Sequence, residues 1–171
     1  MDKILIIGLN GSPKKEGNTA FLLQEALEAA QAQGAQTQFI HVSQALAGLA
    51  DPFCSQCREV CQAQCTQAKA LEEVFELFRR CDGLILASPV YFGTVSAQLK
   101  ALWDKTRFLR KEQALYNVVG GALAVGASRF GGQESTIHAL HQMMLVQGMT
   151  IVGNGFVGEG CGHHGAAGQK P

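Results

Sequence analysis

Short apolar runs alternate along the chain with segments in which apolar residues recur at helical spacing. The uninterrupted apolar run at 4–9 is typical of a strand buried on both faces of a parallel sheet. Helical spacing over 19–33 follows it, and Gly34 marks a stop. The same alternation then predicts strands at 37–42, 83–88 and 117–128, helices at about 68–80, 96–108 and 134–147, and a short fifth strand within 149–158. Five strands that alternate with helices indicate a doubly wound parallel α/β sheet with right-handed crossovers.

One connection is much longer than the others. It runs from about residue 43 to 67, roughly 25 residues where 2 to 6 are usual, and a loop of that length is usually functional or disordered. The chain has 171 residues without repeats or a Pro/Gly-rich linker, so we expect one domain over 1–171 that carries this insertion. The insertion contains four of the six cysteines: Cys54, Cys57, Cys61 and Cys65. Cys81 precedes a predicted strand, where a free cysteine commonly packs as a small apolar residue.

Charge and hydropathy narrow the classes of partner. Fourteen basic residues balance fourteen acidic ones, so no net field favours nucleic acid or an anionic membrane. The longest apolar stretch after the first strand, at 118–127, is half of the roughly 20 residues that a membrane helix needs. The N-terminal apolar run meets a turn directly and is unlike a signal peptide, so we expect a cytoplasmic protein. Thiols stay reduced there, which favours metal or redox roles for clustered cysteines.

The segment GLNGSPKKEGNTA follows the first strand and leads into the first helix. Unpaired backbone N–H groups and the positive end of a helix dipole meet at such a turn and form an anion site. Ser12, Asn18 and Thr19 add side-chain donors, and Lys14 adds positive charge. We therefore expect a phosphate group here.

Two common phosphate motifs do not fit this segment. A Walker loop would need Gly and then Lys after Gly11, but Glu16 stands in the glycine's place and Asn18 follows Gly17. The dinucleotide fingerprint fails because Gly8 is followed two positions later by Asn10. ATP, GTP and an NAD held in the Rossmann manner are disfavoured.

Two more glycine-bearing segments follow later strands. In SPVYFG an aromatic pair that can flank a flat ring precedes Gly93, and GASRFGGQES follows the fourth strand. Ligands of open α/β sheets bind beyond the carboxyl ends of the strands, at a topological switch point. We therefore expect all three segments to converge on one ligand.

Together these segments resemble the flavodoxin-like NADPH-dependent FMN reductase family, and the cysteine-bearing insertion resembles its iron–sulfur flavoprotein branch. GSPKKEGNT, SPVYFG, LKALWDKT and GGQE match in order and spacing over about residues 3–153. The resemblance implies a flavodoxin-like sheet of order 2-1-3-4-5 and one non-covalent FMN per subunit. It also implies a homodimer or homotetramer. The segment 99–109 is then either an interface helix or an ordinary core helix.

The resemblance implies three groups of FMN-binding residues. The phosphate would be held by Ser12, Lys14, Asn18 and Thr19. The isoalloxazine would be lined by Pro89, Val90, Tyr91, Phe92 and Gly93, and its other side closed by Ser128, Arg129 and Gly132. The flavin itself carries the chemistry of such proteins, so no side chain is expected to be catalytic.

Four thiolates can hold a [4Fe–4S] cluster or a zinc ion. The iron–sulfur branch carries C-x-x-C-x-x-C with a fourth cysteine nearby, whereas this chain reads C-x-x-C-x-x-x-C-x-x-x-C. On a regular helix, Cys57 and Cys65 would lie about 12 Å apart along the axis. Either the chain is irregular there, or fewer than four of the cysteines Cys54, Cys57, Cys61 and Cys65 bind one centre. A cluster is favoured, and zinc, a redox disulfide and structural thiols stay open.

The expected function is electron transfer between a one-electron donor of the ferredoxin type or NAD(P)H, a [4Fe–4S] cluster and FMN, with a small-molecule acceptor. Two rivals remain. One is a cluster-free NAD(P)H-dependent FMN or quinone reductase, and the other is a non-enzymatic flavin electron carrier or redox sensor.

The remaining histidines and the last cysteine lie near the C-terminus. His138 and His141 are three residues apart on a predicted helix, and a metal would need further ligands nearby, so we expect a structural role. Cys161, His163 and His164 lie in a glycine-rich tail that we expect to be a mobile end.

Overall fold

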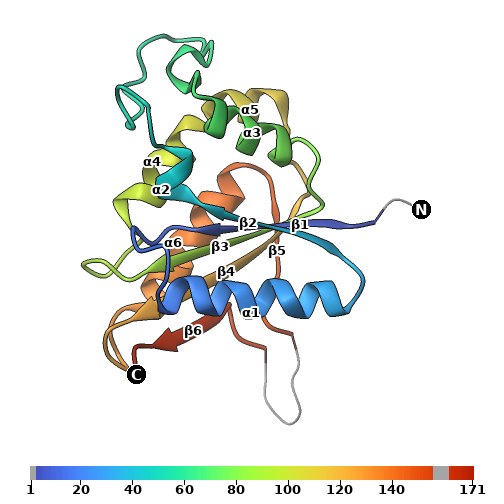
Figure 1. Ribbon diagram of the computed structural model, residues 1–171, viewed down its shortest axis with the longest axis vertical. Helices are drawn as coiled ribbons and strands as arrows, with labels where there is room; N and C mark the ends of the chain where they lie inside the picture. The colour runs from blue at the N-terminus through green and yellow to red at the C-terminus, as the bar shows by residue number, and fades with distance from the viewer. Residues whose placement is uncertain (1–2, 156–161) are drawn as a thin grey trace.

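The computed structural model describes residues 3–155 and 162–171 as a parallel sheet with helices on both faces (Figure 1). The strands are β1 (Leu5–Asn10), β2 (Gln36–His41), β3 (Gly83–Pro89), β4 (Val119–Gly126), β5 (Thr150–Ile151) and β6 (Ala166–Gln169). The helices are α1 (Asn18–Ala32), α2 (Val42–Ala45), α3 (Lys69–Phe78), α4 (Ala97–Lys105), α5 (Arg107–Glu112) and α6 (Gln133–Val146). A single 3-10 turn, η1, covers Gln64–Thr66.

The strand order β2-β1-β3-β4-β5 confirms the predicted flavodoxin-like order, and every pairing is parallel. The chain passes from β1 to β2 in one direction and then crosses back over β1 to reach β3. The strand order therefore reverses next to β1, and the carboxyl ends of β1, β3 and β4 are neighbours at one edge. Loops that follow these three strands are brought together by the topology alone.

The fifth position of the sheet is built from two short strands. β5 has only two residues and pairs with Val119 and Gly120 at the start of β4, whereas β6 pairs with 123–126 further along the same strand. The expected mobile C-terminal end is therefore wrong for residues 166–169, which form β6. Pairing with β4 satisfies the backbone groups of this tail. Cys161 lies outside the described residues.

The two faces of the sheet carry cores of very different size. Helices α2 to α6 cover one face, and α1 lies alone on the other (Figure 1). The larger core joins α3, α4 and α6 to β1, β3 and β4, whereas the smaller core on the α1 side groups four buried apolar residues: Leu23, Leu27, Ala87 and Leu123. Gly8 lets α1 approach β1 closely, because a Cβ there would lie 2.8 Å from the Leu23 Cδ1 atom.

The predicted helix at 96–108 is two helices in the structure. Thr106 lies between α4 and α5, and its hydroxyl donates 2.6 Å to the carbonyl of Trp103, which ends the first helix. The apolar side chains of α4 from Leu99 onward are buried within the subunit, whereas Lys100 and Asp104 form an ion pair of 2.6 Å on its outer side. Segment 99–109 thus contributes to the core of its own subunit.

The long connection after β2 confirms the predicted insertion. It begins with the short helix α2, continues without helix or strand, and reaches α3 through the turn η1. In Figure 1 it extends beyond the helical layer, above α3, α4 and α5. No helix in the described part of the chain is long and apolar enough to cross a membrane.

Candidate functional site

The loop after β1 is organised by Asn10, the last residue of the strand and fully buried. Its Oδ1 accepts a hydrogen bond of 3.1 Å from the backbone N–H of Ser12, and its Nδ2 lies 3.5 Å from the carbonyl of Lys14. The Ser12 hydroxyl in turn accepts 3.1 Å from the N–H of Lys14. These bonds hold the turn in one conformation before any ligand binds.

The same loop delivers the chain to the start of α1. Among the described residues no side chain caps this helix, and the residue before it, Gly17, has an extended backbone. The first N–H groups of α1 are therefore available to an anion. Of the predicted phosphate-binding residues, Ser12 and Thr19 are buried, whereas Lys14 and Asn18 are exposed. All four lie on this one turn.

Ser96, the N-cap of α4, connects this loop to the next one. Its hydroxyl donates 2.6 Å to the carbonyl of Gly11 and accepts 3.3 Å from the N–H of Leu99. Gly11 also donates 2.8 Å to the carbonyl of Ala87 in β3. A side chain at Gly11 would not fit, because its Cβ would lie 2.8 Å from Leu99 Cβ.

Beyond β3 the chain makes a tight hairpin turn. Tyr91 and Thr94 exchange backbone hydrogen bonds of 2.9 and 3.2 Å, and Phe92 and Gly93 between them both have positive φ, 49° and 80°. Two central residues of positive φ are the mark of a type I′ turn. This turn directs the Phe92 side chain outward, where it is fully exposed, next to a half-exposed Tyr91.

The loop after β4 is fixed from inside by a glutamine. The buried Gln133 donates 2.6 Å to the carbonyl of Ser128 and accepts 2.9 Å from the N–H of Gly131. Ser135 then donates 2.8 Å to the carbonyl of Gly93, and a Cβ at Gly132 would lie 3.2 Å from Gly93 Cα. The second and third loops are therefore in contact.

The predicted ligand residues thus occupy three adjoining loops at the carboxyl edge of β1, β3 and β4. Sequence reasoning missed the residues that fix those loops, namely Asn10, Ser96 and Gln133. Only Asn10 carried a signal, since it is a polar residue that ends an apolar strand. Ser96 and Gln133 act through bonds to residues far away in the sequence or inside a loop, which no local pattern shows.

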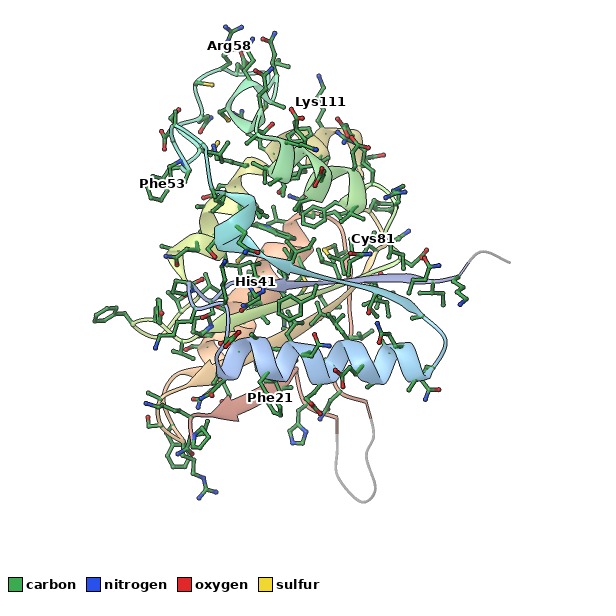
Figure 2. All side chains as sticks on the ribbon, viewed as in Figure 1. Phe21, His41, Phe53, Arg58, Cys81 and Lys111 are labelled. Atoms are coloured by element: carbon green, nitrogen blue, oxygen red, sulfur yellow. The ribbon has the colours of Figure 1, made fainter. Side chains whose placement is uncertain are left out.

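His41 at the end of β2 contacts the first loop from the side. Its Nδ1 lies 3.1 Å from the Nδ2 of Asn10, so the amide donates and the ring accepts. Burial lowers the pKa of His41, and the positive charge of Lys15 lowers it further. A neutral His41 is what this hydrogen bond requires. In Figure 2 its ring lies beside the sheet, close to the start of α1.

The cysteine insertion is irregular, not helical. Cys54 and Cys61 are half-buried, Cys57 and Cys65 are exposed, and all four are free thiols. Among the described residues, no three donors already surround one point as metal ligands. The concern that a straight helix would separate Cys57 from Cys65 does not apply, because the only regular element between 51 and 68 is the turn η1.

Two cations from α4 and α5 hold the backbone of this insertion. The Nζ of Lys105 donates to the carbonyls of Phe53 and Cys65, each at 3.3 Å. The guanidinium of Arg107 donates 3.0 Å to the carbonyl of Arg58 and 2.8 Å to that of Glu59. Phe53 and Arg58 lie on the part of the chain that extends away from the sheet (Figure 2).

The other candidate residues have different surroundings. Cys81 is buried between the sheet and α3 (Figure 2), and burial raises the pKa of its thiol to about 12, as expected of a packing residue. The tertiary structure brings His164 to His138, with ring nitrogens 3.1 Å apart, and the ring of His141 is also near. Burial lowers the pKa of His141.

An apolar cavity of about 490 Å³ extends along the sheet from the amino ends of the strands, away from the three loops. Its walls include Ile4, Gly83 and Val119 at the amino ends of β1, β3 and β4. Ligands of this class of sheet bind at the carboxyl edge, so the cavity is not the predicted site.

Comparison with known proteins gives concordant matches. Residues 3–164 match the family described as NADPH-dependent FMN reductase. An iron–sulfur flavoprotein of Methanocaldococcus jannaschii is 43% identical over 169 residues, covering 95% of this chain and 81% of that protein. One of Methanosarcina thermophila is 41% identical over 150 residues, covering 87% and 77%. The crystal structure of an apo NADH:FMN oxidoreductase superposes with a TM-score of 0.69 at 26% identity, covering 89% and 73%.

Proposed function

Because this chain belongs to the NADPH-dependent FMN reductase family and is a flavin-dependent oxidoreductase, we propose that it works as an iron–sulfur flavoprotein with FMN at the carboxyl edge of the sheet. The family that the sequence motifs predicted is confirmed. One observation carries the site: three loops that follow neighbouring strands are fastened to one another by Ser96 and Ser135, beside an uncapped helix and two exposed aromatic rings.

The first loop holds the FMN phosphate. The free N–H groups at the start of α1 and the hydroxyls of Ser12 and Thr19 donate to its oxygens, and Lys14 adds a positive charge. Asn18 supplies a side-chain amide at the first helical position. The bonds from Asn10 pre-organise this loop, so little ordering is needed when the phosphate arrives.

The second and third loops hold the flavin ring. The backbone of 89–93 and the rings of Tyr91 and Phe92 would line the isoalloxazine, and Ser128, Arg129 and Gly132 would close its other side. The positive φ of Phe92 and Gly93 exposes a ring and a stretch of bare backbone at the same place. When bound, FMN accepts a hydride or transfers single electrons, and the chain orients it and excludes water.

The cysteine insertion holds the [4Fe–4S] cluster, with Cys54, Cys57, Cys61 and Cys65 as its thiolate donors. The number and the chemistry of these four donors fit a [4Fe–4S] cluster. The backbone also fits the cluster, because Lys105 binds carbonyls on both sides of the cysteine segment and so brings its two ends together. Rotation of the side chains is still needed, since no three donors of the described chain converge. With both groups bound, the protein would serve electron transfer between a ferredoxin-type donor or NAD(P)H and a small-molecule acceptor.

A cluster-free NAD(P)H-dependent FMN or quinone reductase is the second candidate, because the matching family is described as NADPH-dependent FMN reductase and the superposed structure is that of an NADH:FMN oxidoreductase. Anaerobic purification with iron and acid-labile sulfide analysis separates the two. Four irons and four sulfides per FMN support the cluster, whereas zinc or no metal contradicts it. Rapid bleaching of the flavin by NADPH, with no reduction by ferredoxin, would favour the second candidate.

The flavin site has its own test. The apoprotein is titrated with FMN and with riboflavin, which has the same ring but no phosphate, and quenching of flavin fluorescence is followed. We expect riboflavin to bind at least about tenfold more weakly, because it loses the charge-assisted bonds of the first loop. Equal affinities would contradict the assignment of that loop to the phosphate. A homodimer or homotetramer remains a proposal, which light scattering after size exclusion tests.

A further inference from the structure

Lys105, the last residue of α4, is a buried cation without an anionic partner. Its side chain is 1% exposed. The only hydrogen bonds of its ammonium group among the described residues are those to the carbonyls of Phe53 and Cys65. None of the ion pairs within 3–155 and 162–171 includes it. Burying an ammonium group is costly unless an opposite charge compensates it. Such a residue indicates an anion that the protein chain itself does not supply.

The location of Lys105 indicates that this anion binds within the cysteine loop. The two carbonyls stand at the two ends of the segment that carries the four cysteines, so both ends of this segment bind the Nζ atom of Lys105. An ammonium group has three N–H donors, and two carbonyls use two of them. One donor and the whole positive charge are left at the base of the loop. Arg107 binds carbonyls in the middle of the same loop and places a second cation beside it.

We propose that Lys105 is a positioning residue for the iron–sulfur cluster, because its charge compensates the thiolate-ligated centre and its hydrogen bonds close the loop around it. The inference rests on the proposed function and deepens it. Thiolate ligation makes the centre negative, and reduction adds another negative charge. A buried cation nearby therefore stabilises the reduced form more than the oxidised form and raises the reduction potential.

The experiment compares three variants of the holoprotein with wild type. Lys105→Gln keeps a donor but removes the charge, and Lys105→Arg keeps the charge. Lys100→Gln is the matched control, because Lys100 lies on the same helix but is exposed and paired with Asp104. Each protein is purified anaerobically, its iron and sulfide are determined, its circular dichroism is recorded, and its cluster is titrated potentiometrically with detection by electron paramagnetic resonance.

We expect Lys105→Gln to lower the equilibrium constant for one-electron reduction at least tenfold, which corresponds to about 59 mV. Lys105→Arg and Lys100→Gln should stay within about threefold of wild type on the same scale. Loss of iron from Lys105→Gln alone, with unchanged circular dichroism, supports the same conclusion.

Three results overturn the inference. A loaded Lys105→Gln variant with the wild-type potential shows that the charge does not act on the cluster. Equal loss of iron from Lys105→Gln and Lys105→Arg shows that charge is not what the centre needs. Wild-type protein without iron and sulfide overturns the cluster assignment as well, so failure of the proposed function is distinguishable from failure of this inference alone.

Discussion

Ser96→Ala removes the hydroxyl that fastens the loop after β1 to α4. Two bonds are lost: the one accepted from the N–H of Leu99 and the one donated to the carbonyl of Gly11. Loss of a helix N-cap costs about 1 kcal/mol. The buried Gly11 carbonyl then has no other partner among the described residues, which costs a further 1–3 kcal/mol or so. Because the two effects share the Ser96 hydroxyl, we expect the free energy of unfolding to fall by about 2–3 kcal/mol in total.

The assay is urea unfolding of the apoprotein followed by circular dichroism, because bound FMN would add its own stabilisation. The free energy of unfolding should fall by that amount, and in a thermal scan of the same apoprotein the melting temperature should fall by about 4–12 °C for a chain of this size. Ser135→Ala is the matched control, since that hydroxyl also donates to loop carbonyls but is exposed, so that water replaces it at a cost within about 0.5 kcal/mol. Ser96→Ala with the stability of the control would refute the reasoning. The same variant should also bind FMN more weakly.

Three further perturbations test the site and its surroundings. Gly11→Ala places a Cβ 2.8 Å from Leu99 Cβ, so we expect lower stability and loss of FMN binding, and a wild-type unfolding midpoint would contradict the close approach. Phe92→Ala should leave the free energy of unfolding within about 0.5 kcal/mol of wild type, because the ring is exposed, yet raise the dissociation constant for FMN; unchanged affinity would remove Phe92 from the site. Burial lowers the pKa of both His41 and His141 below the ordinary value of 6.5, so the unfolded chain takes up protons first as pH falls. Stability should be complete above about pH 7 and decrease as the pH falls through 6.5 towards the lower folded-state pKa, and urea midpoints at pH 7.5 and 5.5 measure it. A smaller decrease is expected in the double variant His41→Gln/His141→Gln, and equal midpoints at both pH values would show that the two rings titrate normally in the fold.

The cysteine insertion shows where local pattern stops being informative. Cys57, Cys61 and Cys65 recur every four residues, which is helical spacing, yet the chain there is irregular. The reason lies far away in sequence, because Lys105 and Arg107 bind carbonyls that a helix would need for its own hydrogen bonds. A helix at that place would also be held by little packing, since the segment is largely exposed.

The C-terminal tail was misjudged for a related reason. Glycine and histidine give it no apolar periodicity, so it reads as a mobile end. Residues 166–169 nevertheless form β6, because β5 ends after two residues and leaves the rest of β4 with unpaired backbone groups. The unpaired edge of β4 determines where the tail binds, and the sequence of the tail itself carries no sign of that edge.

The sequence by itself determined the order of strands β1 to β5 and of the longer helices between them, because buried parallel strands are continuous apolar runs and such helices keep a period of 3.6 residues. It also located the three loops of the candidate site, since a parallel sheet brings the carboxyl ends of its strands to one edge. Only the tertiary structure decided how those loops are held. Asn10, Ser96 and Gln133 act through hydrogen bonds to partners chosen by folding, and Lys105 is buried beside the cysteines by a helix that begins more than thirty residues later. Contacts between distant segments depend on packing, which no local pattern encodes.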